Sequence, residues 1–239
     1  NSLPDLNKVI TKYGISAKKS LGQHFLLDTN LTDRIAKIAR VENSFVFEIG
    51  AGPGGLTRSI LAHGARRLIT VEKDNRCILA LTDLQSVFPD RLEVIQGDAL
   101  KLDLSKIVNQ QYKVVANLPY NIGTSLLIGW LKKISSIDRM TLMFQKEVAD
   151  RLVARPSTKE YGRLSIITQW LCEVKVEFNI DPMVFVPPPN VVSSIVTLIP
   201  RKIPLAHAKW NALERVTATA FNQRRKMLRS SLKEFSLNF

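Results

Sequence analysis

One segment restricts the folds open to this chain more than any other: an apolar run that leads directly into a cluster of glycines. It is Phe45-Val-Phe-Glu-Ile-Gly-Ala-Gly-Pro-Gly-Gly55, and the amphipathic stretch Leu56–His63 follows it. This order is typical of a strand that turns sharply into a helix, where missing side chains let the backbone approach a nucleoside ligand. Gly50, Gly52 and Gly55 also fit a dinucleotide site, and a tight turn without a ligand can carry the same glycines. The motif therefore predicts the local fold and leaves its ligand open.

Short apolar runs alternate with helical patterns over residues 45–199. They predict seven strands, at Phe45–Ile49, Leu68–Glu72, Leu92–Gln96, Lys113–Asn117, Met140–Phe144, Val174–Ile180 and Val191–Ile199. Amphipathic segments separate the first six, which is typical of a parallel sheet covered by helices. The last two are joined by residues 181–190, which contain four prolines and no helical pattern, so we expect an antiparallel pair there. The fold class is therefore α/β, with a seven-stranded, mostly parallel sheet.

The positive charge of the chain is concentrated at its two ends. The net charge is +13, of which residues 1–24 carry +3 and residues 201–239 carry +7, whereas the long middle carries only +3. A single basic run usually solvates a helix face, but clustering at both ends favours a polyanionic partner. After Pro200 the pattern is helical, and the apolar residues of Phe221–Phe235 fall on one side of a predicted helix. We predict one domain over residues 1–200, with a basic extension over 1–27, and a small basic helical domain over 201–239.

The composition shows no sign of a secreted or membrane-bound protein. Cys77 and Cys172 lie far apart, lack metal-ligand spacing and are too few for a disulfide framework. No apolar run reaches the roughly 20 residues needed to cross a bilayer, and the N-terminus lacks the apolar core of a signal peptide. We expect a cytoplasmic protein without a membrane segment or a metal site.

Two carboxylates follow neighbouring strands of the predicted sheet. Glu72 ends the second strand, 22 residues after Gly50, where it can accept hydrogen bonds from both hydroxyls of a ribose. Asp98 follows the third strand and could accept from an adenine amino group, although it could equally cap a helix after a turn. Both NAD and S-adenosylmethionine contain these groups, so the two carboxylates indicate a nucleoside cofactor without choosing between them.

The fourth predicted strand ends in Asn117-Leu-Pro-Tyr120, which favours methyl transfer over hydride transfer. An adenine amino group is a poor nucleophile because its lone pair is delocalised into the ring. If the Asn117 side-chain oxygen and the Leu118 carbonyl accept its hydrogens, the lone pair is left directed at a sulfonium methyl group. Pro119 would fix the backbone, and Tyr120 would offer an aromatic face to the base. The same tetrapeptide can also simply end a strand in a turn.

In the order and spacing of these motifs, the chain resembles the ribosomal RNA adenine dimethyltransferases, which dimethylate two adjacent adenosines near the 3′ end of small-subunit rRNA. The matching segments span nearly the whole chain: Lys19-Ser-Leu-Gly-Gln-His-Phe-Leu26, Phe47-Glu-Ile-Gly-Ala-Gly-Pro-Gly54, Val71-Glu72, Gly97-Asp98-Ala99, Asn117-Leu-Pro-Tyr-Asn-Ile-Gly-Thr124, Gln145-Lys-Glu-Val-Ala-Asp-Arg151, Tyr161-Gly-Arg-Leu-Ser165, Phe185-Val-Pro-Pro-Pro189 and Phe221-Asn-Gln-Arg-Arg-Lys226. The resemblance implies a Rossmann-like class I methyltransferase that uses S-adenosyl-L-methionine. It also implies a role in small-subunit maturation, with the rRNA of a pre-ribosomal particle as partner. We further expect a monomer.

The resemblance also implies roles for individual residues. The cofactor contacts are expected at His24, Leu26, Gly50, Gly52, Glu72, Asp98 and Asn117. The family usually has Asn at the position of His24, and an imidazole can also donate or accept a hydrogen bond. Phe185 resembles the second aromatic wall that stacks on a flipped adenine opposite Tyr120, and a core Phe at a strand end is the alternative. The RNA contacts are expected at Arg224, Arg225, Lys226 and Arg229.

Other functions fit part of the pattern. A large-subunit rRNA dimethylase, the kind that confers macrolide resistance, shares the glycine turn and the Asn-x-Pro-Tyr motif, but the flanking Asn121–Ser125 and Gln223–Lys226 resemble the small-subunit family more. A non-catalytic ribosome assembly factor or a transcription factor of this fold fits the basic ends, yet the intact Glu72 and Asn117–Tyr120 favour retained chemistry. A dehydrogenase would need an acid or base for hydride transfer near Asn117, and the sequence offers no candidate.

Overall fold

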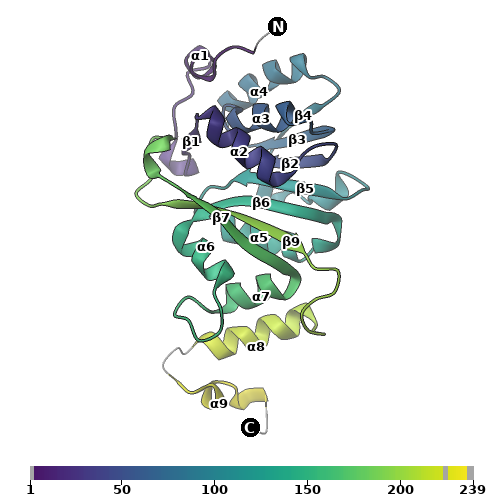
Figure 1. Ribbon diagram of the computed structural model, residues 1–239, viewed down its shortest axis with the longest axis vertical. Helices are drawn as coiled ribbons and strands as arrows, with labels where there is room; N and C mark the ends of the chain where they lie inside the picture. The colour runs from purple at the N-terminus through teal and green to yellow at the C-terminus, as the bar shows by residue number, and fades with distance from the viewer. Residues whose placement is uncertain (1–2, 223–225, 236–239) are drawn as a thin grey trace.

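The computed structural model describes residues 3–222 and 226–235 and has an α/β architecture built on a seven-stranded sheet (Figure 1). The strands of this sheet are β2 Phe45–Ile49, β3 Arg67–Glu72, β4 Leu92–Gln96, β5 Tyr112–Asn117, β6 Ile137–Gln145, β7 Cys172–Ile180 and β9 Ser193–Pro200. The α-helices are α1 Leu6–Lys12, α2 Thr29–Ala39, α3 Gly55–Ala62, α4 Asn75–Val87, α5 Gly123–Leu131, α6 Lys146–Val153, α7 Arg163–Leu171, α8 Trp210–Asn222 and α9 Leu228–Ser231. Two short strands, β1 Phe25–Leu26 and β8 Phe185–Val186, form a separate antiparallel pair. None of the described helices combines the length and the apolar character needed to span a membrane.

The sheet is parallel over most of its width. Its strand order is β4-β3-β2-β5-β6-β9-β7, and the first five strands in that order run parallel to one another. Strand β9 pairs antiparallel with both β6 and β7, so the predicted antiparallel pair is confirmed and joins the rest of the sheet through β9. Because β2, β3, β4 and β5 are parallel, their carboxyl ends meet at one edge, which is where open α/β sheets bind ligands.

Both faces of the sheet are covered because its strands are apolar on both sides. In β2, Phe47 and Ile49 belong to a core shared with α5, α6 and α7, whereas Val46 belongs to a core shared with α2 and α3. Strand β5 repeats this pattern, with Val114 on the first side and Val115 on the second. Alternate residues of a strand point to opposite faces, so a continuous apolar run is what a sheet with helices on both sides requires.

The starts of β6, β7 and β9 differ from the sequence-based expectation, and the pair β1 and β8 was not predicted. Strands β6 and β7 begin earlier, at Ile137 and Cys172 rather than at Met140 and Val174, whereas β9 begins later. Strand β9 begins two residues after the predicted Val191, because Val191 and Val192 lie outside the sheet and are 41% and 37% exposed. The Val192 carbonyl accepts instead from the backbone N–H of Lys146, at 2.8 Å. Strands β1 and β8 are too short to show a periodic pattern, and each contributes only two residues.

The single helix predicted over Phe221–Phe235 is wrong. Helix α8 ends at Asn222, and Met227 has an extended backbone that precedes the separate short helix α9. The Glu234 side chain accepts a hydrogen bond from Thr219 Oγ1 at 3.0 Å and lies 3.8 Å from the Arg215 guanidinium. The chain therefore folds back along α8, which buries Leu232 to 6% exposure, whereas a continuous helix would carry these residues away from it.

Helix α8 packs against the body of the molecule through aromatic side chains. The Trp170 and Trp210 rings lie 6.2 Å apart, and Trp170 Nε1 donates to the Ala206 carbonyl at 2.7 Å. The Tyr161 and Phe221 rings meet edge to face at 6.1 Å. The division of the chain at residue 200 stays a prediction, and these contacts seat the start of the C-terminal segment on α7 (Figure 1).

A carboxylic acid is buried in the middle of the sheet. Glu48 on β2 is 1% exposed, and its Oε2 accepts a hydrogen bond from Thr57 Oγ1 at 2.6 Å. Burial disfavours the charged carboxylate and raises the pKa of Glu48 to about 8, and the nearby Glu72 adds to this shift, whereas the Thr57 bond opposes it. The carboxyl therefore keeps its proton at pH values at which an exposed Glu has lost it.

This buried acid predicts how stability depends on pH. Between the ordinary pKa of 4.5 and about 8, folded Glu48 holds a proton that the unfolded chain has released, so the free energy of unfolding falls as pH rises. The Glu48→Gln variant lacks this proton. As the pH rises across this window, the free energy of unfolding of the variant should therefore increase relative to that of the unmodified protein, by up to about 1.4 kcal/mol per pH unit. Urea unfolding at pH 5 and pH 8 measures the difference.

The control for this prediction is Glu93→Gln. Glu93 lies on the edge strand β4 and pairs with Arg67 at the surface, so its replacement should give no matching gain with rising pH. A stability difference for Glu48→Gln that stays constant between pH 5 and pH 8 would show that Glu48 is ionised in the folded protein.

Candidate functional site

A cavity of about 220 Å³ opens at the carboxyl ends of β2, β3, β4 and β5. Its remaining wall is formed by Ser20–Leu26, which precedes and includes β1. The structure brings to this cavity every residue that the sequence assigned to the cofactor and all four residues of the predicted catalytic tetrapeptide: His24, Leu26, Gly50, Gly52, Glu72, Asp98, Asn117, Leu118, Pro119 and Tyr120. Their individual roles stay predictions, but they all line one cavity.

The glycine turn is shaped by two different requirements. Gly52 has a φ of +55°, a backbone conformation that side chains disfavour, and its N–H donates to Glu72 Oε2 at 2.8 Å. Gly55 begins α3, and a Cβ there would lie only 2.7 Å from the Leu26 carbonyl oxygen. The third glycine of the motif therefore allows β1 to pack closely against α3, while the earlier glycines form the floor of the cavity.

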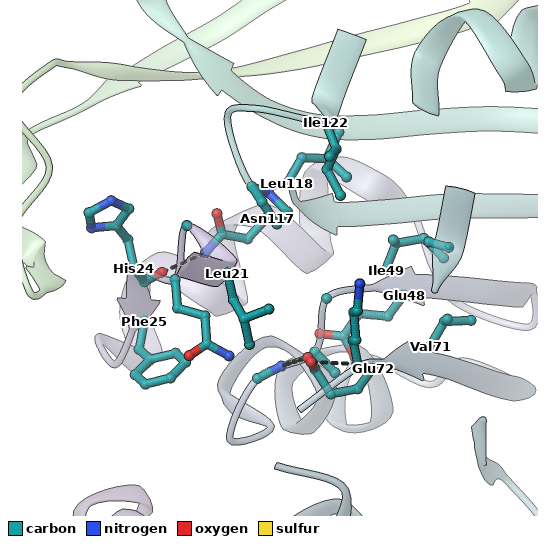
Figure 2. Close-up of a pocket in the computed structure, with 18 of the residues that line it drawn as sticks. Leu21, His24, Phe25, Glu48, Ile49, Val71, Glu72, Asn117, Leu118 and Ile122 are labelled. Atoms are coloured by element: carbon teal, nitrogen blue, oxygen red, sulfur yellow. Dashed lines mark hydrogen bonds between the residues drawn. The ribbon is translucent and has the colours of Figure 1, made fainter. Parts of the chain in front are cut away.

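Glu72 connects the ends of two strands through its carboxylate. It is 7% exposed and accepts backbone hydrogen bonds from Gly52 at 2.8 Å, Lys73 at 2.7 Å and Asp74 at 2.9 Å. Figure 2 shows the Glu72 side chain at the cavity. A carboxylate offers about four lone-pair positions, so three such bonds leave it able to accept from a ligand as well. Glu72 therefore lies at the cavity wall as a fixed acceptor, suited to the hydroxyls of a ribose.

Asp98 fits both of its interpretations. Its side chain accepts from the Leu100 N–H at 3.1 Å, which caps the 3₁₀ helix Ala99–Lys101, so the predicted cap is confirmed. Its other oxygen lies 3.1 Å from the Lys73 ammonium, which holds the pKa of Asp98 below its usual range. The carboxylate also lines the cavity. A contact between Asp98 and an adenine amino group stays a prediction.

The end of β5 fixes the direction of the Asn117 amide. Asn117 Nδ2 donates to the His24 carbonyl at 3.1 Å, so the amide nitrogen points to the segment that precedes β1 (Figure 2). A carbonyl can only accept, which assigns the nitrogen to that side and leaves the amide oxygen as the acceptor on the other side. The Pro119 carbonyl accepts from the Ile122 and Gly123 N–H groups at 3.1 Å, which holds the following residues in a tight turn.

Tyr120 is held at both its ring and its hydroxyl. Its OH lies 2.6 Å from Ser193 Oγ, and its ring stacks against the His24 imidazole with 5.7 Å between centroids and an interplanar angle of 27°. Burial raises the pKa of Tyr120, so the phenol stays neutral at physiological pH. The imidazole in turn places Nδ1 2.8 Å from the Pro187 carbonyl. Nothing in the sequence indicated that His24 and Tyr120 would stack.

The structure does not bring Phe185 to the cavity. Its side chain is 1% exposed, lies on β8 opposite Leu26 and packs in the core that includes α2 and α3. This position matches the alternative of a core Phe at a strand end. An aromatic wall at Phe185 stays a prediction and would require its side chain to leave that core.

Glu48 also lines the cavity, and sequence reasoning did not single it out. An acid inside an otherwise apolar strand, two residues before the first glycine of the turn, was the signal available for it.

Of the predicted RNA-binding residues, Arg224 and Arg225 lie outside the described residues. Lys226 and Arg229 are exposed near α9, at the end of the molecule opposite α1 (Figure 1). The described residues contain no cluster of His, Cys, Asp and Glu that could hold a metal ion.

Comparison with known proteins identifies the family. A family model described as ribosomal RNA adenine dimethylase matches residues 14–238. The chain is 56% identical over 234 residues to the ribosomal RNA small subunit methyltransferase A of Rhodospirillum rubrum, covering 98% of this chain and 81% of that protein. It is 54% identical to the protein of the same name from Paramagnetospirillum magneticum, covering 97% of this chain and 83% of that one.

Solved structures agree with these relatives. A dimethyladenosine transferase from Plasmodium falciparum superposes with a TM-score of 0.79 at 30% identity, covering 88% of this chain and 75% of that chain. The 23S rRNA methyltransferase ErmE superposes with a TM-score of 0.70 at 30% identity, covering 88% of this chain and 84% of that chain. The fold is thus a known architecture, and the chain belongs to the ribosomal RNA adenine dimethylase family.

Proposed function

We propose that the chain dimethylates the exocyclic amino groups of two adjacent adenosines near the 3′ end of small-subunit rRNA, with S-adenosyl-L-methionine as methyl donor. The observation that carries this proposal is the position of Asn117–Tyr120, which lines the same cavity as the glycine turn and Glu72. The 56% identity to a small-subunit methyltransferase, against 30% to the large-subunit enzyme ErmE, supports the small subunit as substrate. We further propose that the chain acts in the cytoplasm as a monomer on a pre-ribosomal particle.

The cavity has the features that S-adenosylmethionine requires. Gly50 and Gly52 present backbone without side chains, and Glu72 retains acceptor capacity for ribose hydroxyls. Asp98 lies at the next strand end and offers an acceptor to an adenine amino group. When bound here, S-adenosylmethionine supplies an electrophilic sulfonium methyl group. His24 and Leu26 close the cavity from the side of the N-terminal segment.

The end of β5 prepares the target amino group for attack. Because Asn117 Nδ2 is committed to the His24 carbonyl, its oxygen is the atom that accepts a hydrogen from the adenine amino group. The Leu118 carbonyl would accept the second hydrogen. With both hydrogens held, the nitrogen lone pair forms the new N–C bond while the methyl–sulfur bond breaks, and the amine then releases a proton to solvent. No charged base is needed, because the alkylated amine is acidic.

Tyr120 offers its ring to the base. Its bond to Ser193 and its stack with His24 fix the plane of that ring before any base arrives, which lowers the entropy lost on binding.

Mapping the methyl groups tests the proposed function. The chain is incubated with labelled S-adenosylmethionine and undermethylated small subunits, beside large subunits as the alternative substrate, and the labelled nucleotides are located. We expect label on two adjacent adenosines near the 3′ end of the small-subunit rRNA. Label in the large subunit alone would contradict the proposal.

We predict that Glu72→Gln weakens the binding of S-adenosylmethionine. A charge-assisted hydrogen bond is worth roughly 1.5–3 kcal/mol, which corresponds to about ten- to a hundredfold in affinity. Calorimetric titration measures the affinity, on protein whose cooperative thermal transition shows that it is folded. Glu93→Gln, at the surface of the neighbouring strand, is the matched control and should bind normally. An unchanged affinity in folded Glu72→Gln would remove Glu72 from the cofactor site.

We predict that Asn117→Ala slows methyl transfer while leaving the binding of ribosomal subunits almost unchanged. Loss of a preorganised polar group should cost roughly 2.7–4 kcal/mol, about a hundred- to a thousandfold in rate, because the amide oxygen acts as the nitrogen becomes tetrahedral. Single-turnover methylation and filter binding on the same subunits separate the two effects. Asn179→Ala removes an Asn from β7 that bonds Ser194, and it should leave the rate unchanged. Equal losses in both assays would make Asn117 an RNA contact instead.

A further inference from the structure

The segment of residues 14–24, here called the strap, forms one wall of the cavity. Ser20, Leu21, Gly22, Gln23 and His24 line it, and Figure 2 shows Leu21 and His24 on the opposite side from Ile49 and Val71. The strap contains only the short 3₁₀ helix Lys19–Leu21 between α1 and β1. Its position therefore depends on the contacts that it makes with the rest of the molecule.

Two side chains from the start of α4 hold the strap. The Asp74 side chain is 1% exposed, and its Oδ2 accepts from Arg76 at 2.6 Å and from Gln23 Nε2 at 3.1 Å. The Arg76 guanidinium also donates to the Ser16 carbonyl at 2.8 Å, to Ser16 Oγ at 3.1 Å and to the Gly14 carbonyl at 3.4 Å. The Arg76 guanidinium thus holds the beginning of the strap, and the buried Asp74 carboxylate holds its end. We call Asp74 and Arg76 the latch.

The far end of the strap touches the tetrapeptide at the end of β5. The His24 carbonyl receives the Asn117 amide, and a Cβ at Gly22 would lie 3.4 Å from Asn121 Oδ1 and 3.6 Å from Pro119 Cβ. The strap therefore crosses the cavity wall from the latch to the residues proposed to hold the target amino group.

The latch is also joined to the cofactor side of the cavity. The Asp74 backbone N–H donates to Glu72 Oε1 at 2.9 Å, so the residue that holds the strap also holds the carboxylate proposed to receive the ribose. Arg76 keeps the pKa of Asp74 at about 2, so the carboxylate is charged at any pH used for an assay. Glu72, the latch, the strap and Asn117 are thus connected around the cavity by hydrogen bonds and by the backbone of the strap.

From this geometry we propose that Asp74 and Arg76 are positioning residues that hold the strap closed over the cofactor pocket and thereby set the rate at which S-adenosylmethionine enters and leaves. The inference rests on the proposed function, because it takes S-adenosylmethionine as the ligand of this cavity. Neither residue contacts the reacting atoms. Their effect passes through the strap, whose separation from α4 requires the bonds of Arg76 to Ser16 and of Asp74 to Gln23 to break.

Replacing Arg76 tests the latch. In Arg76→Gln the fork to Ser16 and Gly14 is lost, so labelled S-adenosylmethionine that is chased with excess unlabelled compound should dissociate roughly tenfold faster. Association should also be faster, so the affinity should change less than either rate. Hydrogen exchange of the amides of residues 14–24 should rise in the free variant, which a purely local effect on α4 would not produce. Arg76→Lys keeps the positive charge but lacks the guanidinium that bonds Ser16 and Gly14. Compared with Arg76→Gln, it should restore the stability of α4 without restoring slow dissociation.

A second variant and a control keep the test decisive. Gln23→Ala removes one latch bond from the side of the strap and leaves the Asp74–Arg76 pair intact, so it should shift dissociation in the same direction even if Arg76→Gln does not fold. Lys12→Gln removes the exposed ion pair of α1 with Asp83, at 2.7 Å, and should leave the rates unchanged. If the unmodified chain binds S-adenosylmethionine and both latch variants release it at the same rate as the unmodified chain, the proposed role of the latch is wrong. The proposed function is then unaffected. If the unmodified chain binds no S-adenosylmethionine, both the proposed function and the proposed role of the latch are wrong.

Discussion

The Glu72 carboxylate is the interaction on which the geometry of the cavity depends. It accepts the N–H groups of Gly52, Lys73 and Asp74, and so joins the glycine turn after β2 to the residues that follow β3. A buried carboxylate is costly unless it is satisfied, and backbone donors from two loops satisfy it while fixing both loops. The nearby Glu48 lies in a different environment, because its carboxyl accepts a hydrogen bond from Thr57 at 2.6 Å and burial raises its pKa to about 8. The two acids beside one cavity thus differ in the donors they meet: three backbone N–H groups at Glu72 and one hydroxyl at Glu48.

The mixed sheet explains why the segment Asn117–Tyr120 meets the start of β9. Strands β2 to β5 are parallel and place four loops at one edge, whereas β9 runs antiparallel between β6 and β7. The start of β9 therefore arrives at the edge where β5 ends, and Ser193 there meets the Tyr120 hydroxyl. The antiparallel pair is thus part of the site: it supplies the group that orients the aromatic ring of the tetrapeptide.

The sequence predicted the sheet and the cavity well because both follow from local patterns. The strands are apolar runs or, in β7, an alternation of apolar and polar residues, and the cavity residues stand at strand ends, whose meeting point is dictated by parallel topology. Contacts between distant short segments could not be predicted. The pairing of β1 with β8 and the stack of His24 on Tyr120 involve few residues without periodicity. The helix over 221–235 failed because one-sided apolar spacing also fits two segments folded back on each other.

At position 24 the backbone and the side chain make different contacts within the site. The sequence resemblance led us to expect Asn at this position, whereas this chain has His24. The hydrogen bond that orients the Asn117 amide goes to the carbonyl of residue 24, so it does not depend on which side chain that residue carries. The imidazole is then free to take other contacts, stacking on Tyr120 and placing Nδ1 2.8 Å from the Pro187 carbonyl. In the proposed mechanism the reacting amino group meets the amide oxygen of Asn117, so a change of side chain at position 24 should leave the orientation of that amide intact as long as the strap holds the carbonyl in place.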